Sequence, residues 1–211
     1  MVIFMEQFII SISREFGSLG HEIAEQIARY YNLTLYDRNI LNEVANSRNV
    51  DVEPLHEYDE ERISRIFHRT IRGMSTHISD HVAQLQFDFL KEKAKSGESF
   101  VVVGRCSESI LKEYKGLISI FIRGDRESKI HQVMEAHHLT RNEAIYMIRK
   151  KDWRRKEYHN THCDYRWGDS RNYDLTINSS KLCLDECVQL LIDYIDKRYK
   201  KIYEDIRNKM E

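Results

Sequence analysis

The fold of this chain is decided by residues 8–31, FIISISREFGSLGHEIAEQIARYY. The nearly continuous apolar run at 8–13 predicts a buried strand, because a strand covered on both faces loses the alternation of polar and apolar residues. Gly17 and Gly20 then predict a turn, and apolar residues at helical spacing predict a helix from Gly20 to Tyr31. A strand that enters a helix through glycines presents backbone N–H groups at the positive helix end, which suits a phosphate group.

The glycine turn matches the common phosphate-binding pattern GxxxxGK(S/T) only in part. With Gly20 as the second glycine of the pattern, Glu15 stands in place of the first glycine. His21 then replaces the lysine, and Glu22 replaces the hydroxyl residue. We therefore expect a turn that binds nucleotide phosphates but lacks the lysine and hydroxyl side chains that usually take part in the chemistry.

Length and composition limit the class of protein. A chain of 211 residues is expected to form a single domain, 1–211, with a sizeable core. A formal net charge of −1 gives no field that would recruit nucleic acid or an anionic membrane, and no apolar run is long enough to span a bilayer. The four cysteines form no CxxC pair, so we expect reduced thiols in a cytoplasmic protein without a signal peptide.

Four more strands are expected beyond the first, each followed by a helix. The expected strands are 33–36, 100–103, 117–122 and 173–178. The expected helices after the first are 39–48, 76–96, 106–114, 126–137, 140–156 and a long one from about 184. Strands that alternate with helices predict an α/β fold with a parallel five-stranded sheet and helices on both faces. Residues 51–97 carry almost no strand signal, which predicts a helical insertion.

Arginines gather where the predicted strands end. Arg14, Arg105 and Arg123 each follow directly on a strand, and Asp37 and Arg38 follow the second strand. Ligands of parallel α/β sheets bind at the carboxyl ends of the strands, so this placement indicates an anionic ligand. A second basic group, with six Lys or Arg residues among eight, lies at 149–156.

Five separated segments resemble the cytidylate kinase-like family, a divergent branch of the nucleoside monophosphate kinase-like P-loop proteins. They are SISREFGSLGHEIA at 11–24, LYDR at 35–38, VVVGRC at 101–106, DWRR at 152–155 with Tyr158, and YDLTINSS at 173–180. The segments fall in family order, and the resemblance covers residues 8–192.

The resemblance implies transfer of the γ-phosphoryl group of ATP, with Mg²⁺, to a small phosphate-bearing acceptor such as CMP. It implies a core at 1–50, 98–140 and 172–211, an acceptor-binding helical insertion at 51–97 and an arginine-rich lid at 141–171. Phosphoryl transfer depends mainly on positioning and on cations around the transferred group, which fits the arginines.

The resemblance also assigns roles to individual residues. Binding of the ATP phosphates falls to Arg14, Gly17, Ser18, Leu19, Gly20, His21 and Glu22. Catalytic roles in the lid fall to Arg149, Asp152, Arg154 and Arg155. Acceptor binding falls to Asp37, Arg38 and Arg105. No protein metal ligand is implied, since Mg²⁺ is held through the nucleotide phosphates.

Several of these residues also have a simpler structural interpretation. Arg14 could form a surface salt bridge, and His21 could face water at a helix start. Asp37 could pair with its neighbour Arg38, and Asp152 could form an i, i+3 pair with Arg155 or Arg149. The segment 159–164 (HNTHCD) holds two histidines and a cysteine, but it lacks the usual four-ligand zinc spacing, and we expect no metal there.

Three functions remain open on the sequence alone. The first is an ATP-dependent nucleotide kinase that acts on CMP or a related small acceptor. The second is a nucleotide-binding regulatory protein without transfer activity, which the replaced lysine and hydroxyl residue favour. The third is a kinase of a non-nucleotide metabolite, because the fold does not fix the substrate. The long C-terminal helix is interpreted as core packing, and it also leaves a homodimer open.

Overall fold

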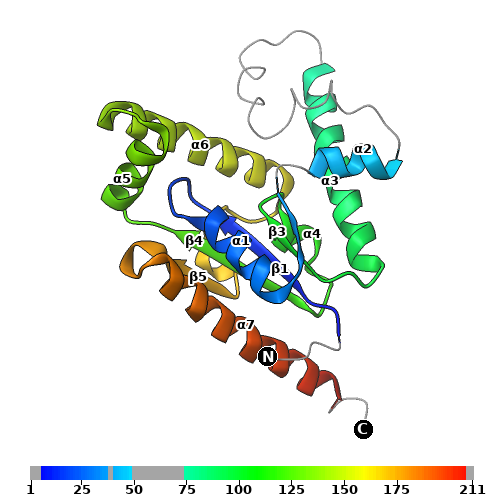
Figure 1. Cartoon of the computed structure of the whole chain (residues 1–211). Coiled ribbons are helices and arrows are strands. Elements are labelled where there is room, and N and C mark those ends of the chain that lie inside the picture. Colours follow the sequence, from blue (N-terminus) through cyan, green and yellow to red (C-terminus); the bar gives the residue numbers. More distant parts are fainter. Residues whose placement is uncertain (1–5, 38–39, 49–73, 208–211) are drawn as a thin grey trace.

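The computed structural model of the chain describes residues 6–37, 40–48 and 74–207, and Figure 1 shows them around one sheet. The five strands lie in the order β2-β3-β1-β4-β5, and every pair is parallel. The strands are β1 (Ile9–Arg14), β2 (Thr34–Tyr36), β3 (Phe100–Val103), β4 (Leu117–Arg123) and β5 (Leu175–Asn178). The helices are α1 (Gly20–Tyr31), α2 (Ile40–Arg48), α3 (Met74–Lys95), α4 (Ser107–Ile110), α5 (Arg126–His137), α6 (Arg141–His162) and α7 (Leu184–Arg207). Short 3₁₀ turns flank β5, at Ser170–Asn172 and Ser179–Lys181.

Strand β1 is the central strand, and all six of its residues are buried. Ile9 lies opposite Phe100 of β3 on one side and Leu117 of β4 on the other. Parallel neighbours need a crossover between them, and helices supply it in each case. The parallel five-stranded sheet predicted from the sequence is therefore confirmed.

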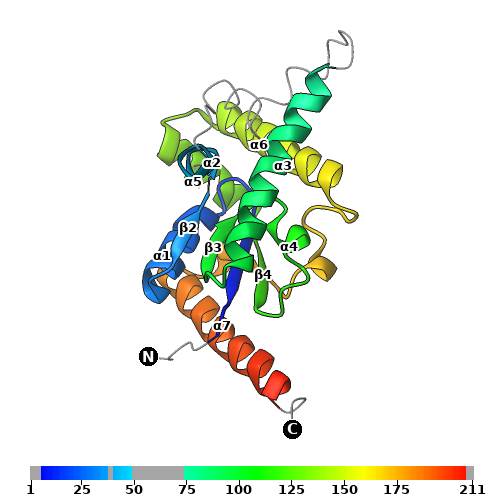
Figure 2. The same cartoon turned by 90° about the vertical axis from the view of Figure 1, so that its right-hand side faces the viewer.

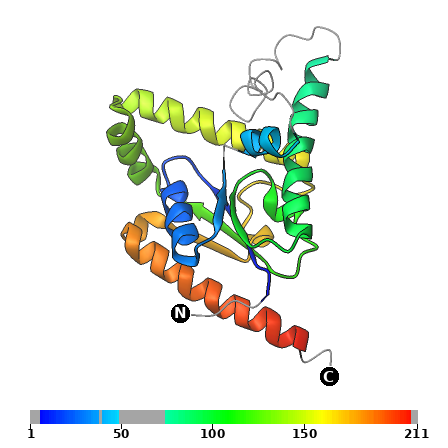
Figure 3. The same ribbon diagram turned by 45° about the vertical axis from the view of Figure 1, so that its right-hand side comes forward.

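Helices cover both faces of the sheet, because successive side chains of a strand point to opposite faces. Ile10 and Ile12 of β1 pack with buried residues of α1 and α7. Ile9 packs on the other face in a cluster with Phe89 and Leu90 of α3. Figure 2 shows α3 and α4 on that second face, and Figure 3 shows α7 running along the sheet on the side of α1.

Helices α5 and α6 form a separate layer across the carboxyl ends of the strands (Figures 1 and 3). They pack on each other through Ile130 and Val133 of α5 and Ala144 and Ile148 of α6. Phe16, from the loop between β1 and α1, packs against the same cluster. The predicted lid helix thus lies directly over the glycine turn.

Several element boundaries differ from those expected, and three of the differences have a bearing on the site. Helix α6 continues to His162, six residues beyond the expected end, because Tyr158 and His159 bury their side chains and neither glycine nor proline interrupts the segment. Strand β5 begins at Leu175 rather than at residue 173, since the Asp174 carboxylate accepts the Ser119 N–H (2.8 Å) where a ladder bond would form. Helix α4 ends at Ile110 rather than at residue 114, and it is preceded by a left-handed turn.

Part of the expected helical insertion lies outside the described residues, as does Arg38. The remainder forms α3, whose start at Met74 and end at Lys95 are close to the helix expected at 76–96. None of the helices in the described part of the chain has both the length and the apolar character needed to cross a bilayer. The division into core, insertion and lid stays a prediction.

Candidate functional site

The loop between β1 and α1, residues 15–19, leaves the first turn of α1 open to an anion. Leu19 is the N-cap, in the left-handed conformation (φ 58°), and makes no side-chain cap hydrogen bond. The N–H groups in the first turn of a helix have no partner within the helix, and the helix dipole makes this end positive. The loop and α1 therefore supply the geometry that binds phosphate groups in many proteins.

Hydroxyl groups hold this loop against the neighbouring strand end. Ser18 Oγ donates to the carbonyl oxygens of Glu15 (2.9 Å) and Ile122 (3.2 Å). Ser179 Oγ in turn donates to the Ser18 carbonyl oxygen (2.7 Å). The Ser18 hydroxyl is thus engaged inside the protein, so this residue can offer a ligand its backbone N–H group.

Packing inside the protein explains both glycines, Gly17 in the loop and Gly20 at the start of α1. A Cβ at Gly17 would lie 2.9 Å from Val133 Cγ2 of α5, and Gly17 has φ +80°. A Cβ at Gly20 would lie 2.5 Å from Arg14 Cβ. Gly20 therefore allows α1 to approach β1, and this requirement exists whether or not a phosphate binds.

Arg14 and His21, which were expected to bind phosphate, both contact Asp37, which was expected to bind the acceptor. Asp37, at the end of β2, lies 3.8 Å from Arg14 Nη2 through Oδ1 and 3.1 Å from His21 Nδ1 through Oδ2. The other ring nitrogen of His21 lies 3.3 Å from Glu25. Arg14 is buried and His21 is about half exposed. The structure thus brings Arg14, His21 and Asp37 into one group.

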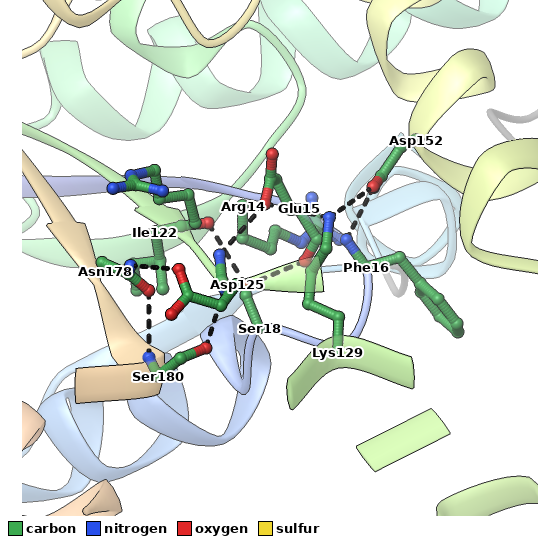
Figure 4. A network of polar contacts seen from close by, with 12 residues as sticks. Arg14, Glu15, Phe16, Ser18, Ile122, Asp125, Lys129, Asp152, Asn178 and Ser180 are labelled. Carbon is green, nitrogen blue, oxygen red and sulfur yellow. Dashed lines mark hydrogen bonds and ion pairs between the residues drawn. The ribbon is translucent and has the colours of Figure 1, made fainter. Parts of the chain in front are cut away.

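Helix α6 is attached to the loop by an ion-pair network, drawn in Figure 4. Asp152 Oδ1 accepts the backbone N–H of Phe16 (2.6 Å), and Asp152 Oδ2 accepts from Lys129 Nζ of α5 (3.2 Å). Lys129 Nζ also donates to Glu15 (3.0 Å), whose carboxylate accepts the Gly124 N–H (3.0 Å) as well. Burial raises the pKa of Asp152. The charges of Lys129 and Arg155 and the hydrogen bond from the Phe16 N–H group lower it, but burial has the larger effect. We call Glu15, Phe16, Lys129, Asp152 and Arg155 the loop–lid contact.

Arg155 completes this contact from the same face of α6. Its Nη1 donates to the Arg14 carbonyl oxygen (3.0 Å), and its guanidinium carbon lies 5.6 Å from the centre of the Phe16 ring. Asp152 is 4.0 Å away, as the expected i, i+3 pair. Of the other two arginines expected in the lid, Arg149 is exposed and Arg154 is half-buried.

A cavity of about 590 Å³ opens beside the loop. The lining comprises Arg14, Glu15, Phe16, Gly17, Leu19, His21, Glu22, Gln132, Val133, Glu135, Ala136, His137 and Arg155. It therefore combines the start of α1 with the guanidinium groups of Arg14 and Arg155, which are donors that suit phosphate oxygens. The carboxylate of Glu22 is a hard oxygen ligand of the kind that Mg²⁺ takes, directly or through water.

Arg105 lies at the neighbouring strand end and is buried, with 3% of its surface exposed. Gly104, Arg105 and Cys106 all have positive φ, at 76°, 57° and 54°. This left-handed turn brings the β3 end against the β1 end, since a Cβ at Gly104 would lie 2.6 Å from Arg14 Nη1. A buried arginine held in an uncommon backbone conformation is a feature typical of functional sites.

A second polar group lies at the far end of α6. His159 Nε2 and Glu108 Oε1 of α4 are 2.6 Å apart, and ligand atoms of Glu108, His159 and Cys163 all lie within 4.8 Å of one another. Burial alone would lower the pKa of His159, but Cys163 and Glu108 raise it to about 9. The adjacent Cys106 thiol and the imidazole of His159 lower the pKa of Cys163 to about 6. We call Glu108, His159 and Cys163 the buried cluster.

The other members of the segment 159–164 lie outside this cluster. The His162 ring packs against the rings of Tyr158 (4.8 Å between centres) and Phe87 (5.6 Å), and Asp164 is exposed. The sequence interpretation thus considered His159 and Cys163 with the wrong neighbours. Their partner Glu108 is about fifty positions earlier in the chain.

Three residues of these two groups were missed from the sequence. Glu15 was noted only as the replacement of a glycine, and Lys129 and Glu108 were not singled out at all. Lys129 stands in a helix of ordinary charge pattern, so nothing local distinguishes it. Glu108 follows a predicted strand end by only five residues, and that position was the available signal.

Comparison with known proteins gives a family and a fold. A model described as the cytidylate kinase-like family matches residues 9–181. A curated protein named cytidylate kinase, from Pyrobaculum islandicum, is 21% identical over 188 residues, which are 89% of this chain and 92% of that protein.

Two solved structures extend the comparison. An uncharacterized protein from Eubacterium ventriosum is 38% identical, with a TM-score of 0.71 over 90% of this chain and 99% of that one. Shikimate kinase from Bacteroides thetaiotaomicron is 11% identical, with a TM-score of 0.51 over 90% of this chain and 98% of that one. At this low identity the second likeness concerns the fold alone.

Proposed function

Because the chain belongs to the cytidylate kinase-like family, we propose that it is a kinase-type phosphotransferase that moves the γ-phosphoryl group of ATP to a small phosphate-bearing acceptor. The observation that carries the proposal is the junction of the glycine loop with the lid helix. Arg155 of α6 reaches the Arg14 carbonyl oxygen, so the lid places a guanidinium group at the cavity beside the start of α1.

The residues of the loop would bind the donor phosphates. Gly17, Leu19, His21 and Glu22 line the same cavity as Arg14 and Arg155. Phosphoryl transfer requires little covalent chemistry from a protein, and fixed cations beside the transferred group lower its barrier. The role of Arg155 is therefore to hold and neutralise the transferring group, and that of Asp152 is to keep α6 at the distance where Arg155 can do so.

Mg²⁺ fits this site through the nucleotide phosphates together with the Glu22 carboxylate. When bound, the ion neutralises phosphate charge and orients the phosphate chain. His21 lies where a lysine usually contacts the phosphates. Asp37 and Glu25 hold the two nitrogens of its ring, so we expect His21 to position Asp37 as much as to contact the nucleotide.

The acceptor would lie at the β3 end, where Arg105 is buried and the preceding Gly104 lies against the Arg14 guanidinium group. An arginine fork binds a phosphate dianion through two hydrogen bonds, which suits an acceptor that already carries a phosphate group. CMP is the first candidate, since the curated relative from Pyrobaculum islandicum is named a cytidylate kinase.

A nucleotide-binding regulatory protein is the second candidate. Two observations favour it: the lysine of the phosphate pattern is absent, and both nitrogens of His21 already have carboxylate partners. Such a protein would bind ATP in the same cavity and transfer nothing.

The test is ADP formation by the purified chain with ATP and Mg²⁺. The acceptor panel contains CMP, the other nucleoside monophosphates and phosphate-free hydroxylated metabolites. ADP formed with one nucleoside monophosphate supports the proposal, and the acceptor is then named by the panel. ADP formed only with a phosphate-free metabolite would move the chain to another class of kinase. ATP binding without ADP formation with any acceptor would favour the regulatory protein.

A further inference from the structure

The buried cluster shares no residue with the lining of the phosphate-loop cavity, and the proposed kinase activity does not use it. Glu108 comes from α4, whereas His159 and Cys163 come from the last turn of α6 and its C-cap. The side chains of Glu108 and His159 are 1% and 4% exposed. Ionisable groups sealed from water to this degree normally pair with one another or bind a metal ion.

The arrangement is compact rather than linear. In a nucleophilic relay the imidazole lies between thiol and carboxylate and keeps them apart. Here the Cys163 sulfur and a Glu108 carboxylate oxygen themselves lie within 4.8 Å of each other, as each does of the imidazole nitrogen. Three donor atoms that lie this close together can share one metal ion.

One atom of the cluster is left without a partner. His159 Nε2 faces Glu108, but the second ring nitrogen, Nδ1, is buried and makes no hydrogen bond within the described part of the protein. An unsatisfied buried polar atom is destabilising, and nearly all such atoms in native proteins have a partner. The two ring nitrogens point in different directions, so an ion shared with Glu108 would be bound through Nε2 and would replace the direct 2.6 Å contact between Nε2 and Glu108 Oε1.

We propose that Cys163, His159 and Glu108 bind one thiophilic divalent transition-metal ion, for which Zn²⁺ is the best match. Thiolate and imidazole donors select zinc over magnesium, which prefers oxygen donors only. Cys106, with which Cys163 packs, lies beside the site but is not one of its three donors. The ion would fasten the C-terminal end of α6 to the turn that carries Arg105.

The test uses the full chain, reduced and stripped of metal with a chelator, and Co²⁺ as a spectroscopic probe. We expect a thiolate-to-cobalt charge-transfer band that saturates at one equivalent, is removed by Zn²⁺ and is unaffected by Mg²⁺. Cys163→Ser should lose the band. Cys183→Ser should keep the band, because Cys183 is exposed and directly precedes α7, outside the cluster. Absence of the band from the wild-type chain, or its persistence in folded Cys163→Ser, would overturn the proposal.

A second measurement needs no variant. Alkylation of the reduced wild-type chain, mapped by mass spectrometry, should modify Cys163 in the absence of metal and spare it when Zn²⁺ is present. Cys183 should react equally in both samples. Equal alkylation of Cys163 with and without Zn²⁺ would contradict the site. Neither measurement depends on ATP, so failure here leaves the proposed kinase function untouched, and the reverse also holds.

Discussion

Helix α6 is held at two places that differ in their access to water. At the loop–lid contact, Asp152 and Arg155 are 18% and 10% exposed, and Arg155 lines an open cavity. At the buried cluster, Glu108 and His159 are 1% and 4% exposed. Groups at the first place can exchange partners with an incoming phosphate, while groups at the second cannot. From this difference we predict that α6 is fixed at its C-terminal end and adjustable over the loop.

The largest expected effect is at the buried cluster. Glu108→Gln removes one charge of a buried pair, and leaving the other uncompensated typically costs about 3–5 kcal/mol of the free energy of unfolding. Denaturant unfolding with a chelator present measures the loss without any metal contribution. Glu113→Gln, a change at an exposed site close by in the chain, should leave the free energy of unfolding unchanged. A loss at Glu108 no larger than at Glu113 would mean that the cluster does not hold the helix.

The next largest effect is on the rate of phosphoryl transfer, and it should differ between two arginines of α6. Arg155→Ala should lower the rate of phosphoryl transfer by about 10²–10³-fold, the range for removing one fixed donor from a developing charge. Arg149→Ala, at an exposed position on α6, should change the rate only a few-fold. ADP formation with the acceptor identified by the panel measures both. A larger loss in Arg149→Ala than in Arg155→Ala would place the reacting phosphate elsewhere along the helix.

A third change tests how the loop itself is packed. Gly20→Ala puts a methyl group against the Arg14 side chain, with 2.5 Å between the two Cβ atoms, and overpacking of this kind costs about 1–3 kcal/mol. Gly97→Ala meets no atom within 4 Å, so it carries only the backbone cost of a positive φ. We expect ATP affinity to fall in Gly20→Ala alone, because only that change displaces Arg14. Equal affinities in the two variants would show that the loop tolerates the displacement.

The smallest effect concerns Asp152 and pH. Its raised pKa means that the folded chain binds this proton more tightly than the unfolded chain. Its stability contribution is therefore present below the unfolded pKa of about 3.9 and is lost as pH rises through the folded pKa. We expect the wild-type chain to lose stability relative to Asp152→Asn between about pH 4 and neutrality, because the folded chain must give up a proton that it binds more tightly than the unfolded chain does. Denaturant unfolding across this range checks the sign. A gain in the stability of the wild type relative to Asp152→Asn would mean that the charge of Lys129 affects the pKa of Asp152 more than burial does.

The two contacts also differ in how far the sequence could predict them. The five strands, the helices between them and the position of the glycine loop follow from periodicity and turn residues, which act locally, whereas the order of the strands in the sheet was not predicted. Asp152 and Arg155 were recognised because a family motif contains them. Lys129 was not, because its importance arises only when α5 folds back beside the loop and places it between Glu15 and Asp152.

The buried cluster was harder still to predict. His159 and Cys163 are four positions apart on α6, but that helix was expected to end before them. The third member, Glu108, comes from another segment and is defined only by tertiary packing. The boundary error arose because long-range burial of Tyr158 and His159 extends the helix, and the local sequence does not record that burial.

Hydrogen exchange of the backbone amides, with and without ATP and Mg²⁺, tests the central claim most directly. If the phosphates bind at the loop and adjust the lid, residues 16–22 and 149–156 should gain protection when the nucleotide is added, while residues 158–163 should already be protected and change little. Protection that appears elsewhere, with residues 16–22 unchanged, would contradict the placement of the phosphate site.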